Sequence, residues 1–211
     1  MRRRAGSFAV IGMTRRDQSQ AVMVRLHSKR VTQSIELLLD DSLDAAVRAQ
    51  WEALRQAQLP SMAMHMGETN RPHITMAVAD MIPPSIEEAL NALVSHVPMP
   101  IRLGPLALFG PRRGRLILVR LVTPSQKLLT AQMEAAELVN GLAGTGSYFV
   151  RGGWTPHVTL ARNLLGDKIA MAIEVLGPMR EISGAAVSMR RWDGQAGRAW
   201  PLPATSGQHN P

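Results

Sequence analysis

Two short segments of the chain repeat each other and carry residue types suited to acid–base chemistry. Residues 72–77 read Pro-His-Ile-Thr-Met-Ala, and residues 156–161 read Pro-His-Val-Thr-Leu-Ala, so that His157 follows His73 by 84 positions. Every difference between the two copies exchanges one apolar residue for another. Chance is a poor explanation for two such copies in a chain with only six histidines.

Strand geometry separates the two kinds of residue within each copy. Side chains alternate between the faces of a strand, so His73 and Thr75 share one face, roughly 6.6 Å apart, while the apolar residues beside them share the other. The same holds for His157 and Thr159. A structural alternative is that the repeat marks the core of two duplicated halves, with each histidine as a satisfied interior residue. Packing does not require an imidazole and a hydroxyl on the second face, so we favour a functional role.

Two histidines with two hydroxyls fit phosphodiester transfer. One imidazole acts as general base and the other as general acid near neutral pH, while a threonine hydroxyl donates a hydrogen bond to a phosphoryl oxygen. The chain has no cysteine, which excludes thiol catalysis and cysteine-ligated zinc. Two histidines without an Asp or Glu in register provide too few ligands to favour a dinuclear metal site. A serine triad is disfavoured because the chain has no Gly-x-Ser-x-Gly nucleophile elbow.

At these residues the chain resembles the 2H phosphoesterase superfamily, the group of the bacterial 2′-5′ RNA ligases and cyclic phosphodiesterases. The matching motifs are residues 73–75 and 157–159, followed by Arg162 as in the His-x-Thr-Leu-x-Arg form of many members. The resemblance spans roughly residues 31–195. It implies an α+β, bilobal and pseudo-symmetric fold, in which two antiparallel sheets line a central cleft with helices outside. It also implies metal-independent, cofactor-free catalysis by His73, Thr75, His157 and Thr159.

Four further residues are candidates for substrate binding, each with a structural alternative. Arg162 follows the second motif and would bind phosphate charge, or else is a solvated arginine at a strand end. Arg71 precedes the first motif and is a weaker candidate for the same role. Trp154 and Tyr148 would stack on a base, although a tryptophan before a strand more often packs in the core.

Two other segments are weaker candidates. One is a basic loop that contains Arg112, Arg113 and Arg115. It is interpreted as an exposed hairpin, or as a surface that guides a chain of phosphates. Residues 62–66, Met-Ala-Met-His-Met, resemble a soft-metal ligand string, but a half-buried strand or loop explains them better.

The apolar periodicity predicts strands alternating with helices. Expected strands cover residues 31–39, 73–79, 101–109, 115–122, 157–161 and 181–192. Expected helices cover residues from Asp41 or Ser42 to 58, 85–97, from Thr123 or Pro124 to 142, and 167–175. The glycine-rich turn of a dinucleotide-binding fold is absent.

The charge of the chain is concentrated at its N-terminus. The formal net charge is +8, but residues 1–30 hold eight basic residues and one acid, so residues 31–211 carry only +1. We expect a basic, disordered extension at 1–30, one bilobal domain at 31–200 and a disordered tail at 201–211. No secretion signal is evident, and the apolar runs are far shorter than the roughly 20 residues of a membrane span. A cytoplasmic monomer is the expectation.

The expected activity is hydrolysis of a 2′,3′-cyclic phosphate or a 2′-linked phosphodiester on RNA or a nucleotide, with 2′-5′ RNA ligation as the reverse reaction. The expected partners are therefore RNA ends or nucleotide 2′,3′-cyclic phosphates, with no membrane. Two alternatives stay open: a non-catalytic RNA- or nucleotide-binding module with the same cleft, and a cyclic phosphodiesterase of small molecules.

Overall fold

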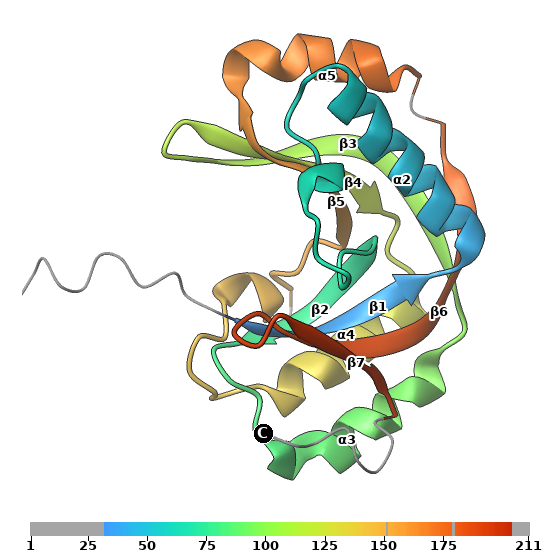
Figure 1. Ribbon diagram of the computed structural model, residues 1–211. Helices are drawn as coiled ribbons and strands as arrows, with labels where there is room; N and C mark the ends of the chain where they lie inside the picture. The colour runs from blue at the N-terminus through green and yellow to red at the C-terminus, as the bar shows by residue number, and fades with distance from the viewer. Residues whose placement is uncertain (1–31, 151, 179, 204–211) are drawn as a thin grey trace, which may run out of the picture. The chain divides into compact units, whose positions relative to one another are not determined.

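The computed structural model describes residues 32–150, 152–178 and 180–203 (Figure 1). Its strands are β1 (Gln33–Leu39), β2 (His73–Ala79), β3 (Met99–Arg112), β4 (Arg115–Val122), β5 (His157–Leu165), β6 (Ile182–Asp193) and β7 (Arg198–Leu202). Its helices are α2 (Asp41–Gln56), α3 (Glu87–Ala92), α4 (Gln126–Leu138) and α5 (Ile169–Leu176). Short 3₁₀ turns are η2 (Met62–Met64), η3 (Pro84–Ile86), η4 (Leu93–His96), η5 (Ser147–Phe149) and η6 (Gly166–Lys168).

The strands form a single antiparallel sheet, in the order β2-β1-β6-β3-β4-β5, with β7 also paired to β6. Strand β6 makes the sheet continuous because it is long enough to pair with β3 along its first residues and with β1 along its later ones. The two pairings meet at Ala186, which is in register with both Met99 of β3 and Leu39 of β1. The α+β class with antiparallel pairing is confirmed. The two expected sheets are hydrogen-bonded into one through β6.

Among the described residues, helices α2 and α4 each pack against strands at the opposite end of the strand order from the strand that precedes them in the chain. Helix α2 follows β1 in the chain, yet it packs against α5 and β5. Helix α4 follows β4, yet it packs against β2 (Figure 1). Each motif strand is therefore covered by a helix whose preceding strand belongs to the other half.

Helix α2 begins at Asp41, one of the two starting residues that the sequence predicts. Asp40 is the N-cap, and its side chain accepts a hydrogen bond from the backbone N–H of Leu43. The buried residues Leu43, Val47, Trp51 and Leu54 recur at helical spacing. This face anchors α2 in the core and fixes the direction in which Trp51 points.

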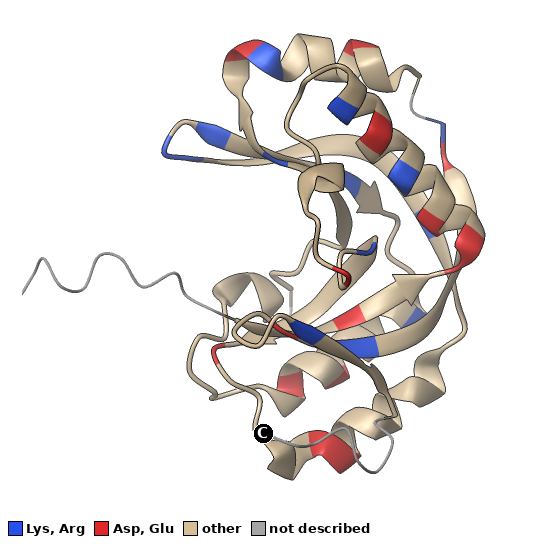
Figure 2. Cartoon of the chain, in the orientation of Figure 1, with Lys and Arg blue, Asp and Glu red and all other residues tan. Residues whose placement is uncertain are grey.

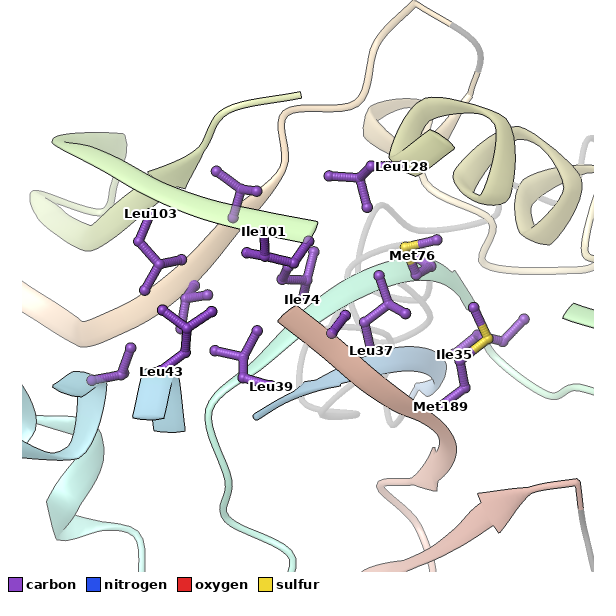
Figure 3. Close-up of a cluster of buried hydrophobic side chains, with 14 of the residues drawn as sticks. Ile35, Leu37, Leu39, Leu43, Ile74, Met76, Ile101, Leu103, Leu128 and Met189 are labelled. Atoms are coloured by element: carbon purple, nitrogen blue, oxygen red, sulfur yellow. The ribbon is translucent and has the colours of Figure 1, made fainter. Parts of the chain in front are cut away.

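The core is made by the apolar faces of the strands and by the helices that cover them. Figure 3 shows part of it, with Ile74 and Met76 of β2 beside residues of β1, β3, α2, α4 and β6. In β5, Val158 and Leu160 are fully buried in the same way. Each such side chain contributes about 1.5–3 kcal/mol to folding. The apolar residues of the two motifs thus hold their strands in place.

Two predictions about the elements were wrong in detail. Residues 85–97 do not form one helix but the succession η3, α3 and η4, which ends at His96 because Pro98 disfavours a helical conformation of Val97 before it. The expected disordered tail does not begin at residue 201, because Pro201 and Leu202 pair with β6 as part of β7. The expected extension at 1–30 and the residues from 204 onward lie outside the described residues.

Candidate active site

The two motif strands present the same alternation of buried and accessible side chains. In β2, His73 and Thr75 are half-buried, whereas Ile74 and Met76 have no exposed surface. Strand β5 repeats the pattern with half-buried His157 and Thr159. The predicted division of each motif into a core face and a polar face is confirmed.

Both histidines are held by the same kind of hydrogen bond. Nδ1 of His73 lies 2.7 Å from the carbonyl oxygen of Arg71, and Nδ1 of His157 lies 2.7 Å from the carbonyl oxygen of Thr155. A carbonyl oxygen only accepts, so Nδ1 must carry the proton in each pair. In the neutral imidazole, Nε2 is then the nitrogen with a lone pair. Each histidine is oriented to exchange a proton at Nε2.

A tryptophan hydrogen bond anchors each motif strand, and one of the two bonds links the motif regions, although β2 and β5 lie at opposite ends of the strand order. The indole N–H of Trp154, three residues before His157, donates to the carbonyl oxygen of Thr75 at 3.0 Å. The indole N–H of Trp51, on α2, donates to the carbonyl oxygen of Thr159 at 2.9 Å. Strands β2 and β5 also contact each other directly. The tertiary structure therefore brings both His-Thr pairs into one region.

The environment of His157 favours the neutral imidazole. Burial lowers the pKa of His157 below its ordinary value of 6.5, and the positive charges of His73 and Arg162 lower it further, against the hydrogen bond to Thr155. The ring of Phe109, on β3, contacts the imidazole edge-to-face, with 4.8 Å between ring centroids. This histidine is suited to accept a proton at neutral pH.

A buried carboxylate beside His73 is the residue that the sequence analysis missed. Glu36, on β1, places Oε1 3.5 Å from Nε2 of His73, accepts from the Ser34 hydroxyl at 2.6 Å and from Nε of Arg190 at 2.8 Å. Burial raises the pKa of Glu36, but the charges of His73 and Arg190 and these hydrogen bonds outweigh it, so the pKa lies below 4.5. The available signal was a lone acid inside the apolar run 35–39.

A family model of the 2′-5′ RNA ligase superfamily matches residues 42–196, which include both motifs. The chain belongs to this superfamily.

Comparison with curated proteins finds no match. Among solved structures, Escherichia coli LigT complexed with NADP+ is 16% identical, with a TM-score of 0.47 over 83% of this chain and 96% of LigT. TT0787 of Thermus thermophilus is 14% identical, with a TM-score of 0.48 over 83% of this chain and 100% of that one. Usb1 of Kluyveromyces marxianus is 10% identical, with a TM-score of 0.45 over 81% of this chain and 97% of that one.

The four residues predicted to bind substrate lie in different settings in this superfamily member. Arg162 is exposed on β5 and acts electrostatically on His157. Nε and Nη2 of Arg71 lie 3.4 Å from a carboxylate oxygen of Asp44. Trp154 is half-buried, packs on the core and bonds to the Thr75 carbonyl, while Tyr148 is 78% exposed in η5. Their roles in binding remain predictions.

A pocket of about 620 Å³ is lined by neighbours of the motifs but by no residue of either motif. Its lining includes Arg71, whose carbonyl orients His73, and Trp51, which holds the Thr159 carbonyl.

The methionine-rich stretch 62–66 forms η2 and the start of the next loop, with Met62 buried and Met66 exposed. No group of three metal-ligating side chains occurs among the described residues, and none of their helices is long and apolar enough to cross a membrane.

Proposed function

We propose that this member of the superfamily is a phosphoesterase that hydrolyses 2′,3′-cyclic phosphates or related 2′-linked phosphodiesters of RNA or nucleotides. The observation that carries the proposal is the matched pair of histidines, each fixed through Nδ1 and each with a threonine on the same strand face. Two imidazoles in one region supply both a proton acceptor and a proton donor, as phosphodiester hydrolysis requires.

In the proposed reaction a water molecule attacks the phosphorus atom. One imidazole takes a proton from the water at Nε2 while the new P–O bond forms. The other gives a proton from Nε2 to the ribose oxygen as its bond to phosphorus breaks. The hydroxyls of Thr75 and Thr159 donate to the phosphoryl oxygens. In reverse, the same groups join a 5′-hydroxyl to a cyclic phosphate, which forms a 2′-5′ linkage without ATP.

The chemistry of the donor set supports a metal-independent reaction. Both histidine Nδ1 atoms are engaged by backbone carbonyls, and Glu36 is already bound by Ser34 and Arg190. The proton transfers need only the two imidazoles. Turnover should therefore persist when divalent ions are removed with EDTA.

The basic β3–β4 hairpin favours an RNA strand over a mononucleotide as the substrate. Residues 99–122 contain five arginines and no acid, and Arg112, Arg113 and Arg115 are exposed at the hairpin end. Figure 2 shows these positive charges at the tip of the hairpin. The same hairpin carries Phe109, which contacts the ring of His157. It therefore runs from the candidate site to a surface suited to backbone phosphates.

The test is turnover of 2′,3′-cyclic nucleotides and of oligonucleotides ending in a cyclic phosphate, with EDTA present. His73→Ala and His157→Ala should each lower kcat by roughly 10²- to 10⁴-fold and leave nucleotide affinity within a few-fold. The matched control is His96→Ala, because His96 pairs with Glu134 outside the motifs and should leave kcat unchanged. A wild type without turnover, in which both motif variants mainly weaken binding, would instead indicate a binding module.

A further inference from the structure

The pocket near the motifs lies between one face of α2 and the loop that leads to β2. Arg48, Trp51 and Glu52 recur at helical spacing on α2 and line one side of it. Residues between Ala63 and Arg71 line the other side. The volume of about 620 Å³ falls within the roughly 300–1,000 Å³ of pockets that hold small molecules. The pocket is therefore large enough for a nucleotide.

Two residues of the lining connect the pocket to the two motifs. Arg71 precedes His73 by two positions, and its carbonyl oxygen lies 2.7 Å from Nδ1 of that histidine. Trp51 lines the pocket, and its indole N–H donates to the carbonyl oxygen of Thr159 at 2.9 Å. A group bound in the pocket is therefore next to a phosphate held by the two His-Thr pairs.

The guanidinium of Arg48 is held in one orientation. Its Nε donates to the carboxylate of Asp44, and its Nη2 donates to the carbonyl oxygen of Asn70 at 3.4 Å. Its Cζ lies over the ring of Trp51, 5.6 Å from the ring centroid. The side chain of Arg48 is nevertheless 44% exposed, so the face that is turned away from the indole is accessible. A guanidinium plane fixed in this way is a platform on which a nucleobase can stack.

Hydrogen bonds within the loop hold the opposite wall of the pocket. The side-chain amide of Asn70 donates to the carbonyl oxygens of Met62 and His65, both at 2.9 Å, and its backbone N–H donates to Gly67 at 2.9 Å. Met66 lies at the end of this loop and is 92% exposed. Its unbranched, polarizable side chain is suited to contact an aromatic ring that enters the pocket.

The charges of the lining distinguish an end for a phosphate from a body for a base. Arg48 and Arg71 share the single carboxylate of Asp44, which leaves one surplus positive charge at the end nearer the first motif. Asp44 lies 3.4 Å from Nε and Nη2 of Arg71, and a guanidinium has five N–H donors, so Arg71 can also donate to a phosphate. Glu52 and Glu68 are the acids of the lining. They disfavour a phosphate deeper in the pocket but not a neutral base.

We propose that this pocket binds the second nucleotide of an RNA substrate, the neighbour of the nucleotide that carries the reacting phosphate. Arg71 contacts the phosphate that joins the two nucleotides. The second base stacks on the guanidinium of Arg48, with Met66 over its other face. In a strand that ends in a cyclic phosphate, this neighbour lies on the 5′ side. The inference rests on the proposed function and adds to it a binding site for a second base.

The first test measures affinity by calorimetry on the full-length protein with ligands that need no turnover. The ligands are a dinucleotide that ends in a 3′-phosphate and the same dinucleotide without its 5′ base. The wild type should bind the complete dinucleotide roughly 5- to 150-fold more tightly, which corresponds to one stacked base. Arg48→Ala should remove most of this difference. Arg48→Lys should remove it too, because lysine keeps the charge but has no plane. The matched control is Arg198→Ala, an exposed arginine on β7 outside the pocket lining, which should keep the difference.

The second test follows the methionine methyl signals in NMR spectra of the protein labelled at its methionine methyl groups. The complete dinucleotide should shift the signal of Met66 through the ring current of the stacked base, and the abasic form should not. Met66→Leu assigns this signal. Met81 is the internal control, because it is 68% exposed and does not line the pocket, and its signal should stay in place.

The outcomes separate this subsite from the proposed function. The subsite is overturned if the wild type binds the complete and the abasic dinucleotide equally well, or if Arg48→Lys keeps the full difference. It is also overturned if the Met66 and Met81 signals respond alike, a result that needs no substitution at Arg48 and so does not depend on the folding of those variants. Absence of turnover on cyclic phosphates would refute the proposed function alone, because neither test requires a reaction.

Discussion

Replacing Trp51 with phenylalanine tests whether the tryptophan on α2 holds the second motif in place. Trp51 is only 3% exposed, and its indole N–H donates to the Thr159 carbonyl at 2.9 Å. Phenylalanine keeps an aromatic ring but has no N–H. The Thr159 carbonyl then loses its donor in a region that water reaches poorly, and the smaller ring leaves a void beside β5.

The expected loss of stability follows from these two changes. A buried acceptor left without a partner costs about 1–3 kcal/mol, and the void adds about 1 kcal/mol. The sum, about 2–4 kcal/mol, is a large part of the roughly 5–15 kcal/mol that stabilises a typical domain. Trp154→Phe should cost less, about 0.5–1.5 kcal/mol, because Trp154 is only half-buried and water can replace its N–H.

Urea unfolding and steady-state kinetics measure the two consequences. Trp51→Phe should lower the free energy of unfolding by the amount above and lower kcat more than it changes KM, since a displaced Thr159 carries His157 with it. Trp200→Phe is the control, because Trp200 donates to Glu87 at 3.4 Å on the other face of β6, and it should leave kcat unchanged. The reasoning is refuted if Trp51→Phe stays within about 0.5 kcal/mol of the wild type and keeps its kcat.

Three further predictions concern pH and salt. Since the pKa of His157 lies below 6.5, the acidic limb of the pH–rate profile should fall below pH 6.5, and a limb above that value would contradict a neutral His157. The folded-state pKa of Glu36 lies below 4.5. As the pH falls through that range, the unfolded chain therefore binds more protons than the folded chain, and the free energy of unfolding drops. Urea unfolding should show a smaller drop with acid in Glu36→Gln than in the wild type. Replacing Arg112 and Arg113 with alanine should weaken binding of oligonucleotides and lower the salt slope by about 0.7 for each phosphate that is no longer neutralised, with mononucleotide turnover as the unchanged reference.

The local sequence pattern was sufficient to predict which side chains of each motif share a strand face. The alternation in residues 73–76 and 157–160 places the imidazole and hydroxyl on one face, because a strand has a period of two whatever surrounds it. The apolar periodicity of the whole chain predicted most strands, and the resemblance to the superfamily implied the α+β class. The periodicity failed at residues 85–97 and at β7, where a following proline and a pairing with β6 decide the backbone.

The relation between the motifs was decided only by the tertiary structure. Glu36 faces His73 because β1 pairs with β2 in one register, and Arg190 joins them because β6 pairs with β1 in another. Trp51 reaches Thr159 across 108 positions of the chain. A one-residue slip in any of these pairings would turn the side chain to the opposite face. The sequence by itself determined two equivalent histidines. Long-range strand pairing placed the carboxylate of Glu36 beside His73 and the ring of Phe109 beside His157.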